Sequence, residues 1–347
     1  MPKPTTIWFV AGKSGGHIIP ALTKANNICK KNKYTRIGFF TTNSAIDKKI
    51  LDNYKNSYDW VTINLENIPG KRITGYPLFF LHVVLSFFKT IFHLIKTRPE
   101  KIISFGGYVS IPVCFAAFFL RIPVELFELN VVPGKAIKLL SKIATKVQIC
   151  FEQAERYLPK KKCHLAEYPI RFSHQVDKEA YPLQKYNFDP AKCTILILGG
   201  SQGSIQINSL VKDWLIKYSQ LYTNIQIIHQ TGANDTTDWN SFYKTITTPT
   251  IVFDFTDNIE PYYQSANIVI CRSGAGTLFE TVFFQKKCIT IPLETATTCH
   301  QVDNAKEISK LYPHLVTVVQ QKEIDQNKDI FFKTLDSYIS KYQETHS

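Results

Sequence analysis

A histidine stands at the end of a glycine-rich turn near the start of the chain. The turn contains Ser14, Gly15 and Gly16 before His17, and it follows the apolar residues 7–10. Glycines let the backbone approach a ligand closely, and a helix that follows such a turn favours negative charge at its N-terminus. An imidazole in this place lies near the ligand, and its pKa range suits a general base. A histidine that only caps or supports the turn is the alternative.

A second glycine-rich turn lies about half the chain further on. Gly199, Gly200, Ser201 and Gly203 follow the apolar run 194–198 and precede a helical pattern. Neither turn matches a P-loop or a complete dinucleotide fingerprint, which weakens the interpretation as a nicotinamide-dependent oxidoreductase. Two such turns predict two nucleotide-fold domains that face one cleft. This arrangement suits an enzyme that holds an activated, phosphate-bearing donor in one domain and an acceptor in the other.

The elements that position these turns alternate between short β-rich runs and helical stretches, the pattern of βαβ units. The sequence therefore predicts an α/β fold with two Rossmann-like domains built on parallel sheets. We expect strands near residues 6–11, 36–41, 59–63, 101–104, 124–127, 146–150, 194–198, 225–229, 251–254, 268–271, 288–291 and 316–319. We expect helices to begin at Pro20, near Ser44, Pro77, Tyr108 and Pro133, and after Ser204, Asn258, Gly276 and His300.

A lysine-rich, proline-punctuated segment over residues 158–181 reads as a linker. Two domains are predicted. Residues 1–168 would bind the acceptor and the membrane, and residues 169–334 would bind the donor. A C-terminal helix over about residues 335–347 is expected to pack back on the first domain.

The net charge of +13 is unevenly distributed along the 347 residues. Residues 1–168 hold 25 Lys and Arg against 10 Asp and Glu, whereas the remaining residues hold 16 against 18. The first half is therefore expected to meet nucleic acid, phospholipid head groups or a phosphorylated acceptor. A basic surface without a partner is the alternative. The eight cysteines show no metal-ligand spacing.

Residues 77–95 form a mostly apolar stretch that approaches the length of a membrane span. His82, Lys89 and His93 interrupt the stretch, and an isolated charge at the bilayer centre costs a few kcal/mol. A helix with one exposed apolar face, lying among the head groups of an anionic leaflet, fits better than a span. A wholly buried core helix is the alternative.

Six segments, taken together, resemble the MurG family of glycosyltransferases in type and order. They are Ser14–Leu22, Phe105–Ser110, Glu128–Gly134, Gly199–Gly203, Cys271–Thr277 with Glu280, and His300–Gln301. The resemblance covers most of the chain. It implies a GT-B arrangement and an inverting transfer of GlcNAc from UDP-GlcNAc to the 4-hydroxyl of MurNAc in the undecaprenyl-linked precursor lipid I, giving lipid II for peptidoglycan synthesis.

The same resemblance implies a set of donor-binding residues. Glu280 would accept hydrogen bonds from the ribose hydroxyls. Thr256 lies where the family binds uracil through main-chain groups, and Gln301 lies where the family contacts the donor sugar. Without the other motifs, Ser201 and Thr277 would be explained as helix caps, and Arg171 would be explained as a residue that forms an ion pair in the linker. The full set is Ser14, Gly15, Gly16, Asn130, Arg171, Ser201, Thr256, Ala275, Gly276, Thr277, Glu280 and Gln301.

On the acceptor side, the resemblance gives His17 the role of the base, with Glu128 as a competing base or as a residue that orients His17. We expect no metal and no cofactor besides the donor substrate, because helix termini and hydroxyls can meet the charge of departing UDP. The implied partners are UDP-GlcNAc, undecaprenyl-linked lipid I and an anionic membrane surface, not nucleic acid. The implied location is peripheral, at the cytoplasmic face of the cell membrane.

The chain departs from the family pattern at several positions. Lys13 and Ser14 replace a usual glycine and threonine, Phe127 and Leu129 replace a usual histidine and glutamine, and Gly276 replaces a usual leucine. The loop before His300 is about one residue longer than usual. A related transferase acting on diacylglycerol is therefore kept as one alternative. A non-catalytic protein that binds a sugar nucleotide or a lipid is the other.

Overall fold

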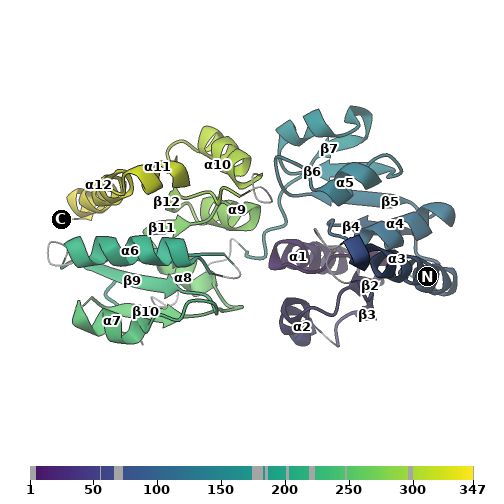
Figure 1. Ribbon diagram of the computed structural model, residues 1–347, viewed down its shortest axis with the longest axis horizontal. Coiled ribbons are helices and arrows are strands. Elements are labelled where there is room, and N and C mark those ends of the chain that lie inside the picture. Colours follow the sequence, from purple (N-terminus) through teal and green to yellow (C-terminus); the bar gives the residue numbers. More distant parts are fainter. Residues whose placement is uncertain are drawn as a thin grey trace. The chain divides into compact units, whose positions relative to one another are not determined.

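In the computed structural model the chain forms two compact α/β units, Met1–Arg171 and Phe172–Ser347 (Figure 1). The structure describes residues 5–54, 56–65, 73–173, 183, 187–200, 203–218, 223–246, 248–295 and 300–346. The boundary follows Arg171, whereas the sequence predicted it after residue 168. Each unit contains a parallel sheet with helices on its faces, which confirms the predicted α/β class.

The first unit is built on a seven-stranded sheet in the order β3-β2-β1-β4-β5-β6-β7. The chain adds strands on one side of β1 and then, from β4 onward, on the other side, as in nucleotide-binding folds. Its elements are β1 (Thr6–Val10), α1 (Gly15–Lys31), β2 (Arg36–Thr41), α2 (Ala45–Leu51), β3 (Asp59–Thr62), α3 (Tyr76–Thr97), β4 (Lys101–Ser104), α4 (Ser110–Phe119), β5 (Val124–Glu128), α5 (Lys135–Leu140), β6 (Lys146–Ile149) and β7 (Cys163–Leu165).

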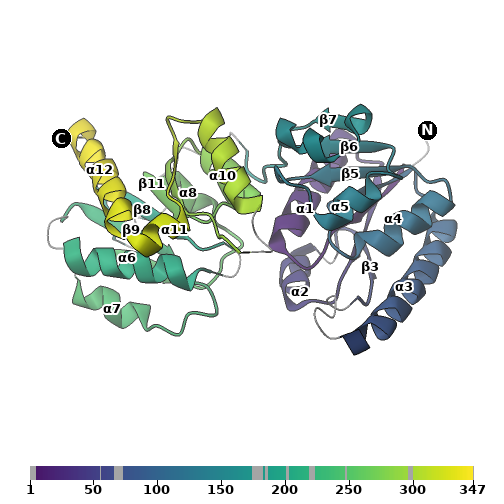
Figure 2. The same cartoon turned by 45° about the horizontal axis from the view of Figure 1, so that its top comes forward.

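Helices cover both faces of this first sheet. On one face, α3, α4 and α5 follow one another (Figure 2) and bury side chains such as Leu94, Val113 and Ile137 against the strands. On the opposite face lies α1, whose Lys24 ammonium is 5.3 Å from the centre of the Phe127 ring. Successive side chains of each strand point to opposite faces of the sheet, and helices cover both of these faces.

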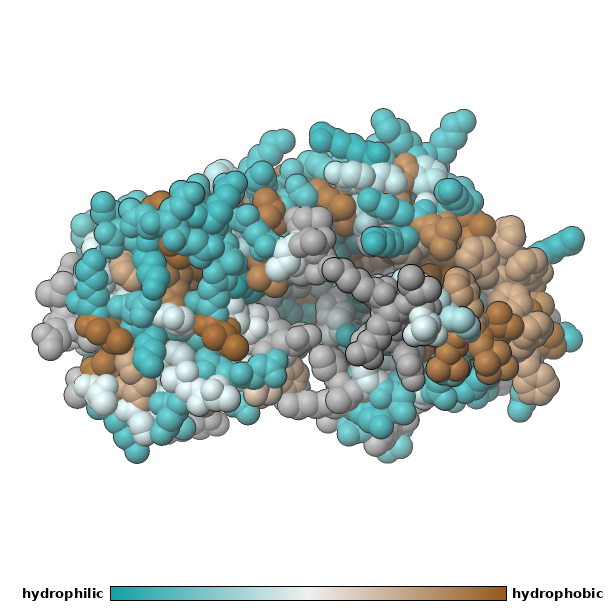
Figure 3. All heavy atoms as spheres, viewed as in Figure 1, coloured by the Kyte–Doolittle hydropathy of each residue, from teal (hydrophilic) through white to brown (hydrophobic). Residues whose placement is uncertain are grey.

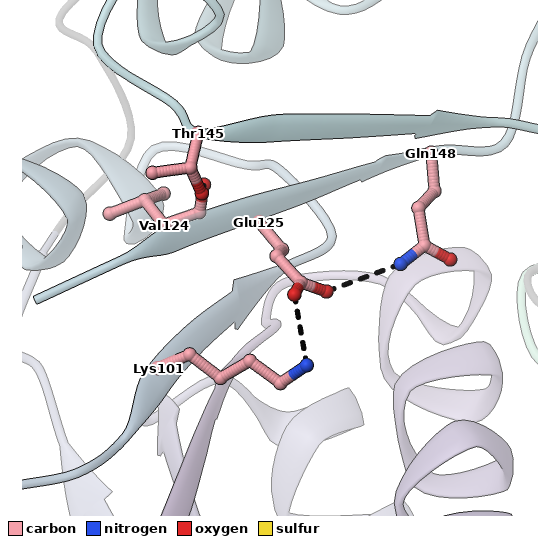
Figure 4. A network of polar contacts seen from close by, with 5 residues as sticks. All are labelled: Lys101, Val124, Glu125, Thr145 and Gln148. Carbon is pink, nitrogen blue, oxygen red and sulfur yellow. Dashed lines mark hydrogen bonds and ion pairs between the residues drawn. The ribbon is translucent and has the colours of Figure 1, made fainter. Parts of the chain in front are cut away.

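A polar network crosses three strands of the first unit (Figure 4). Glu125 on β5 accepts from Lys101 Nζ on β4 at 2.9 Å and from Gln148 Nε2 on β6 at 3.2 Å. Both charged side chains are mostly buried, with 26% and 18% of their surface exposed. The bonds connect β4, β5 and β6 through side chains in addition to the backbone ladder.

The second unit is built on a six-stranded parallel sheet in the order β10-β9-β8-β11-β12-β13. Its elements are β8 (Cys193–Leu198), α6 (Ile205–Tyr218), β9 (Ile225–Gln230), α7 (Trp239–Thr245), β10 (Thr250–Phe253), α8 (Glu260–Ser265), β11 (Ile268–Cys271), α9 (Ala275–Phe283), β12 (Lys287–Thr290), α10 (His300–Leu311), β13 (Val316–Val318), α11 (Gln321–Gln326) and α12 (Asp329–His346).

The C-terminal helix α12 packs into the core of the second unit. Phe331, Leu335 and Ile339 are fully buried in the cluster that also holds Trp214 of α6. Trp214 Nε1 donates to Asp336 Oδ1 at 2.9 Å. The expectation that residues 335–347 pack back on the first unit is therefore corrected. The physical reason is the apolar stripe at four-residue spacing, which α6 and the second sheet bury.

Each predicted strand agrees with an observed strand to within one residue at either end. The start of α1 differs more, because the helix begins at Gly15 and Pro20 lies inside it. Proline at this position removes one backbone bond, to the carbonyl of Gly16, without ending the helix. The rule that places proline at the first helical position therefore put the start of α1 five residues too late.

Candidate functional site

The first group of candidate residues lies at the carboxyl ends of β1, β4 and β5. Strand β1 pairs with β2 on one side and with β4 on the other, so the order of the chain reverses between β1 and β4. Loops that leave a parallel sheet at such a switch point diverge and leave room for a ligand. Ser14, Gly15, Gly16 and His17 follow β1, and Glu128 ends β5.

The first glycine turn is held by a buried carboxylate that sequence reasoning missed. Lys13 has a left-handed φ of 64°. Its backbone N–H donates to Asp47 Oδ1 at 2.8 Å, and Asp47 Oδ2 accepts from the Thr42 backbone N–H at 3.1 Å. Asp47 is fully buried. It therefore fixes the backbone just before Ser14 and the start of α1.

His17 lies beside the second glycine turn of the first unit. A Cβ atom built on Gly107 would lie 3.7 Å from His17 Nδ1 and 3.7 Å from the Gly12 carbonyl oxygen. Gly106 and Gly107 have φ values of 90° and 77°, a region that L side chains rarely adopt. Ser110 Oγ donates to the Gly106 carbonyl at 2.6 Å and fixes this turn. The structure thus brings His17 next to the Phe105–Ser110 motif.

Glu128 organises the loop that carries Asn130. Its Oε1 accepts from the Asn130 backbone N–H at 2.8 Å and from Asn130 Nδ2 at 3.1 Å, and its Oε2 accepts from the Gly134 N–H at 3.1 Å. Burial raises the pKa of Glu128 to about 6, although these N–H donors lower it. The carboxylate is committed to its own loop, and this favours a positioning role over that of a base.

Two departures from the family pattern have a structural explanation. Phe127 and Leu129 flank Glu128 and are both buried. The Phe127 ring stacks on Phe105 with centroids 5.0 Å apart and planes inclined by 9°. Phe127 therefore supports the turn at Phe105–Ser110 from inside the unit, and Leu129 is a buried apolar side chain beside Glu128.

The second group of candidate residues lies at the matching switch point of the second unit, between β8 and β11. The glycine turn that follows β8 is very tight. A Cβ atom on Gly203 would lie 2.3 Å from the Thr231 carbonyl oxygen, and one on Gly199 would lie 2.2 Å from the Ser204 nitrogen. Gly200 and Gly203 have φ values of 86° and 78°. Ser201 lies outside the described residues.

Gln230, at the end of β9, fixes this turn from the side. Its Nε2 donates to the Gly200 carbonyl oxygen at 3.1 Å. Sequence reasoning missed Gln230, because the two partners are thirty residues apart. The amide holds the carbonyl of Gly200 and so orients the peptide units of the turn.

Helix α9 begins where β11 ends and carries several donor-site candidates. Ala275 is buried in its first turn, and Gly276, Thr277 and Glu280 are partly exposed. A Cβ atom built on Gly200 or on Gly274, which precedes α9, would meet no described atom within 4 Å. Two helix N-termini, those of α6 and α9, follow adjacent strands, and no described atom crowds Gly200 or Gly274 in the segments that precede them. This arrangement suits an anion such as a diphosphate.

Helix α10 contributes Gln301 and packs on the loop before α9. Gln301 Oε1 accepts from the Leu293 N–H at 3.0 Å, and Asn304 Nδ2 donates to the Ser273 carbonyl at 3.4 Å. Thr256 follows β10 at the edge of the sheet, and its Oγ1 accepts from the Asn258 N–H at 3.2 Å. Arg171 is the last residue of the first unit.

Within the described part of the chain, no three His, Cys, Asp or Glu side chains gather closely enough to hold a metal ion.

Comparisons with known proteins agree with this division into two units. Residues 7–149 match the glycosyltransferase family 28 N-terminal domain, and residues 194–343 match the corresponding C-terminal domain. A protein of Thermodesulfovibrio yellowstonii, named UDP-N-acetylglucosamine–N-acetylmuramyl-(pentapeptide) pyrophosphoryl-undecaprenol N-acetylglucosamine transferase, is 31% identical over 86% of this chain and 81% of its own. A Sulfurihydrogenibium protein of the same name is 30% identical over 97% and 93%.

Among solved structures, MurG of Acinetobacter baumannii has a TM-score of 0.71 to this chain. The two sequences are 22% identical, over 97% of this chain and 91% of that one. This likeness shows that the chain has the same fold.

Proposed function

The chain belongs to the MurG family of glycosyltransferases, and on that premise we propose that it converts lipid I to lipid II. It transfers GlcNAc from UDP-GlcNAc to the 4-hydroxyl of MurNAc in undecaprenyl-pyrophosphoryl-MurNAc-pentapeptide. The observation that carries this proposal is the pair of glycine turns, one at the switch point of each sheet. Each turn suits one of the two diphosphate-bearing substrates.

The reaction exchanges one bond to the anomeric carbon for another. The MurNAc 4-oxygen forms a bond to the anomeric carbon of GlcNAc from the face opposite the leaving group. The bond from that carbon to the β-phosphate oxygen breaks, and UDP departs with the electron pair. His17 takes the proton of the 4-hydroxyl, and Glu128 holds the neighbouring Asn130 loop in place. Attack from the opposite face inverts the configuration.

The donor is held chiefly by the second unit. The N-termini of α6 and α9, with Ser201 and Thr277, meet the charge on the diphosphate. Glu280 binds the ribose hydroxyls, the segment at Thr256 binds uracil, and Gln301 binds the sugar. Ser14, Gly15, Gly16, Asn130 and Arg171 of the first unit, with Ala275 and Gly276, complete the proposed donor contacts.

The protein acts as a peripheral enzyme on the cytoplasmic face of the membrane. Helix α3 is long and apolar enough to span a bilayer. However, Ser86, Thr90 and Leu94 on one face are buried, with Leu94 in the core of the first unit. A helix packed in this way cannot cross a bilayer without leaving the fold, and this favours attachment along the surface.

An activity assay with the purified full chain tests the proposal. UDP-GlcNAc with a short-chain lipid I analogue should release UDP, and UDP-GlcNAc with diacylglycerol should not. Release with diacylglycerol alone would point to the related lipid glycosyltransferase. Binding of UDP without release on either acceptor would point to a non-catalytic protein.

The role of His17 has its own test. H17A should lower turnover by about 10²–10⁴-fold if the imidazole is the base, with UDP affinity unchanged. H164A, which removes an exposed histidine on β7, is the matched control and should turn over normally. Near-normal turnover of H17A would exclude His17 as the base.

A further inference from the structure

Arg272 is a buried cation at the switch point of the second unit. It follows β11, and only 6% of its surface is exposed. Its Nε donates to Ser204 Oγ at 3.1 Å, and its terminal nitrogens donate to Gln206 Oε1 at 2.7 Å, the Ile291 carbonyl at 3.1 Å and Gln321 Oε1 at 3.1 Å. Burial lowers the pKa of Arg272 to about 10, so the guanidinium stays charged at neutral pH.

The hydrogen bonds of Arg272 within the described residues go to uncharged oxygens. A buried charge is costly, and proteins usually pair it directly with an opposite charge. Here the carboxylate of Asp325 is separated from Arg272 by an amide. Gln206 accepts from Arg272 through Oε1 and donates to Asp325 through Nε2 at 3.2 Å. The positive charge is therefore solvated by dipoles and is only weakly neutralised.

This charge lies at the start of α6, on the residue whose backbone leads into α9. Ser204, which Arg272 contacts, follows Gly203, and its Oγ accepts from the Ile207 N–H at 3.3 Å in the first turn of α6. The backbone of Arg272 leads through Ser273 and Gly274 into α9. The guanidinium thus contacts the start of α6, and its own backbone leads into α9, so one residue connects the two segments that carry Gly200 and Gly274.

We propose that Arg272 is a positioning residue that selects a nucleoside diphosphate: it adds positive potential behind the α6 and α9 N-termini and holds the start of α6 without touching the ligand. This inference rests on the proposed function, which places the UDP diphosphate at this site. It predicts that Arg272 contributes to the affinity for UDP and not to the affinity for uridine, which carries no phosphate.

The test changes the charge around Arg272 without removing its side chain. R272Q would also remove several hydrogen bonds, so loss of the fold would obscure its result. Asp325 is exposed, and D325N removes the distant carboxylate, so the Kd for UDP should fall about twofold. Q206E added to D325N places a carboxylate directly on the guanidinium, so the Kd for UDP should rise about tenfold above that of D325N.

Calorimetry on the full chain with UDP and with uridine provides the readout. The Kd for uridine should stay within about twofold in both variants, because uridine carries no charge for the potential to act on. D329N removes an exposed carboxylate that pairs with Lys217, and it is the matched control with no expected change.

Equal losses of UDP and uridine affinity would mean that the network is only structural, and unchanged UDP affinity would mean that the charge has no role. Either result overturns the inference. A protein that binds UDP with the expected dependence on Arg272 but transfers no sugar to the lipid I analogue would refute only the proposed function.

Discussion

Lys13 occupies a backbone conformation that glycine adopts at lower cost. Its φ of 64° is left-handed, and the family that the chain resembles usually has glycine there. An L side chain in this region costs roughly 1 kcal/mol. Glycine avoids this cost, but it loses more backbone conformational entropy on folding. We therefore expect K13G to raise the free energy of unfolding by about 0.5–1 kcal/mol, measured by urea denaturation.

The control for Lys13 is a lysine with ordinary helical geometry. K30G changes an exposed position in the last turn of α1 and should lower the free energy of unfolding by about 0.5–1 kcal/mol. Destabilisation by both substitutions would mean that the side chain of Lys13 stabilises its turn more than the left-handed backbone strains it.

Glu128 should make stability depend on pH in a specific direction. Burial raises its pKa from 4.5 in the unfolded chain to about 6 in the fold. Its stabilising contribution is therefore complete below pH 4.5 and is lost as the pH rises through about 6. The free energy of unfolding of the wild type minus that of E128Q should fall by about 2 kcal/mol in total as the pH rises from well below 4.5 to well above 6. A difference that is independent of pH, measured by urea denaturation, would contradict the raised pKa.

Single residues also mark the limit of prediction from sequence. His17, Glu128 and Glu280 are recognisable because their motifs are local. Asp47 and Arg272 are not, because their contacts with Lys13 and Ser204, across 34 and 68 residues, form only when the sheets form. Ordinary polar residues acquire such roles through tertiary contacts, and the local sequence pattern does not predict these contacts.

At the level of elements, the end of β9 controls the glycine turn that follows β8. Gln230 donates to the Gly200 carbonyl, and a glutamate at this position could not donate. Q230E should therefore loosen the turn and raise the Kd for UDP about tenfold, the cost of one misplaced buried hydrogen bond. Isothermal titration of the two proteins measures this change.

The same strand supplies a matched control for Q230E. Gln226, near the other end of β9, donates to the Asp189 carbonyl and to Thr194 Oγ1, both at 2.8 Å. Q226E should destabilise the fold and leave the Kd for UDP unchanged. A similar loss of UDP affinity in both variants would mean that the effect comes from general destabilisation.

Most strands were predictable because they fill buried, apolar and β-branched runs bounded by polar turns, whereas β7, a three-residue edge strand with two exposed residues, was not predicted. Two short helices, α7 and α11, were not predicted. Helix α7 has seven residues and depends on Asp238, whose carboxylate accepts from the Ser241 N–H at 3.0 Å. Helix α11 has six residues and depends on a reciprocal capping pair, Gln320 and Glu323. Such helices are stabilised by their caps and by tertiary packing, so apolar periodicity does not reveal them.

At the scale of the whole molecule, the excess of positive charge and the exposed apolar face occur in the same unit. Figure 3 shows hydrophobic residues gathered over α3 and α4, within the unit that carries most of the excess lysine and arginine. On α3, Phe88 and Phe92 are 62% and 76% exposed. Phe87, by contrast, packs on the core and on the Phe119 ring at 5.7 Å. Phe88 and Phe92 are thus the two most exposed apolar side chains of α3.

The proposed attachment to a membrane surface predicts that binding depends on both apolar side chains and lipid charge. Each exposed phenylalanine that enters the apolar region contributes roughly 1.5 kcal/mol or more, so F88S/F92S should weaken binding to anionic vesicles at least tenfold. Vesicle sedimentation measures this loss. The control I216S/L311S changes two exposed apolar residues of the second unit and should bind like the wild type. Neutral vesicles should bind the wild type more weakly, because basic residues lose their anionic partners. Equal binding of both double variants would show that α3 does not carry the attachment.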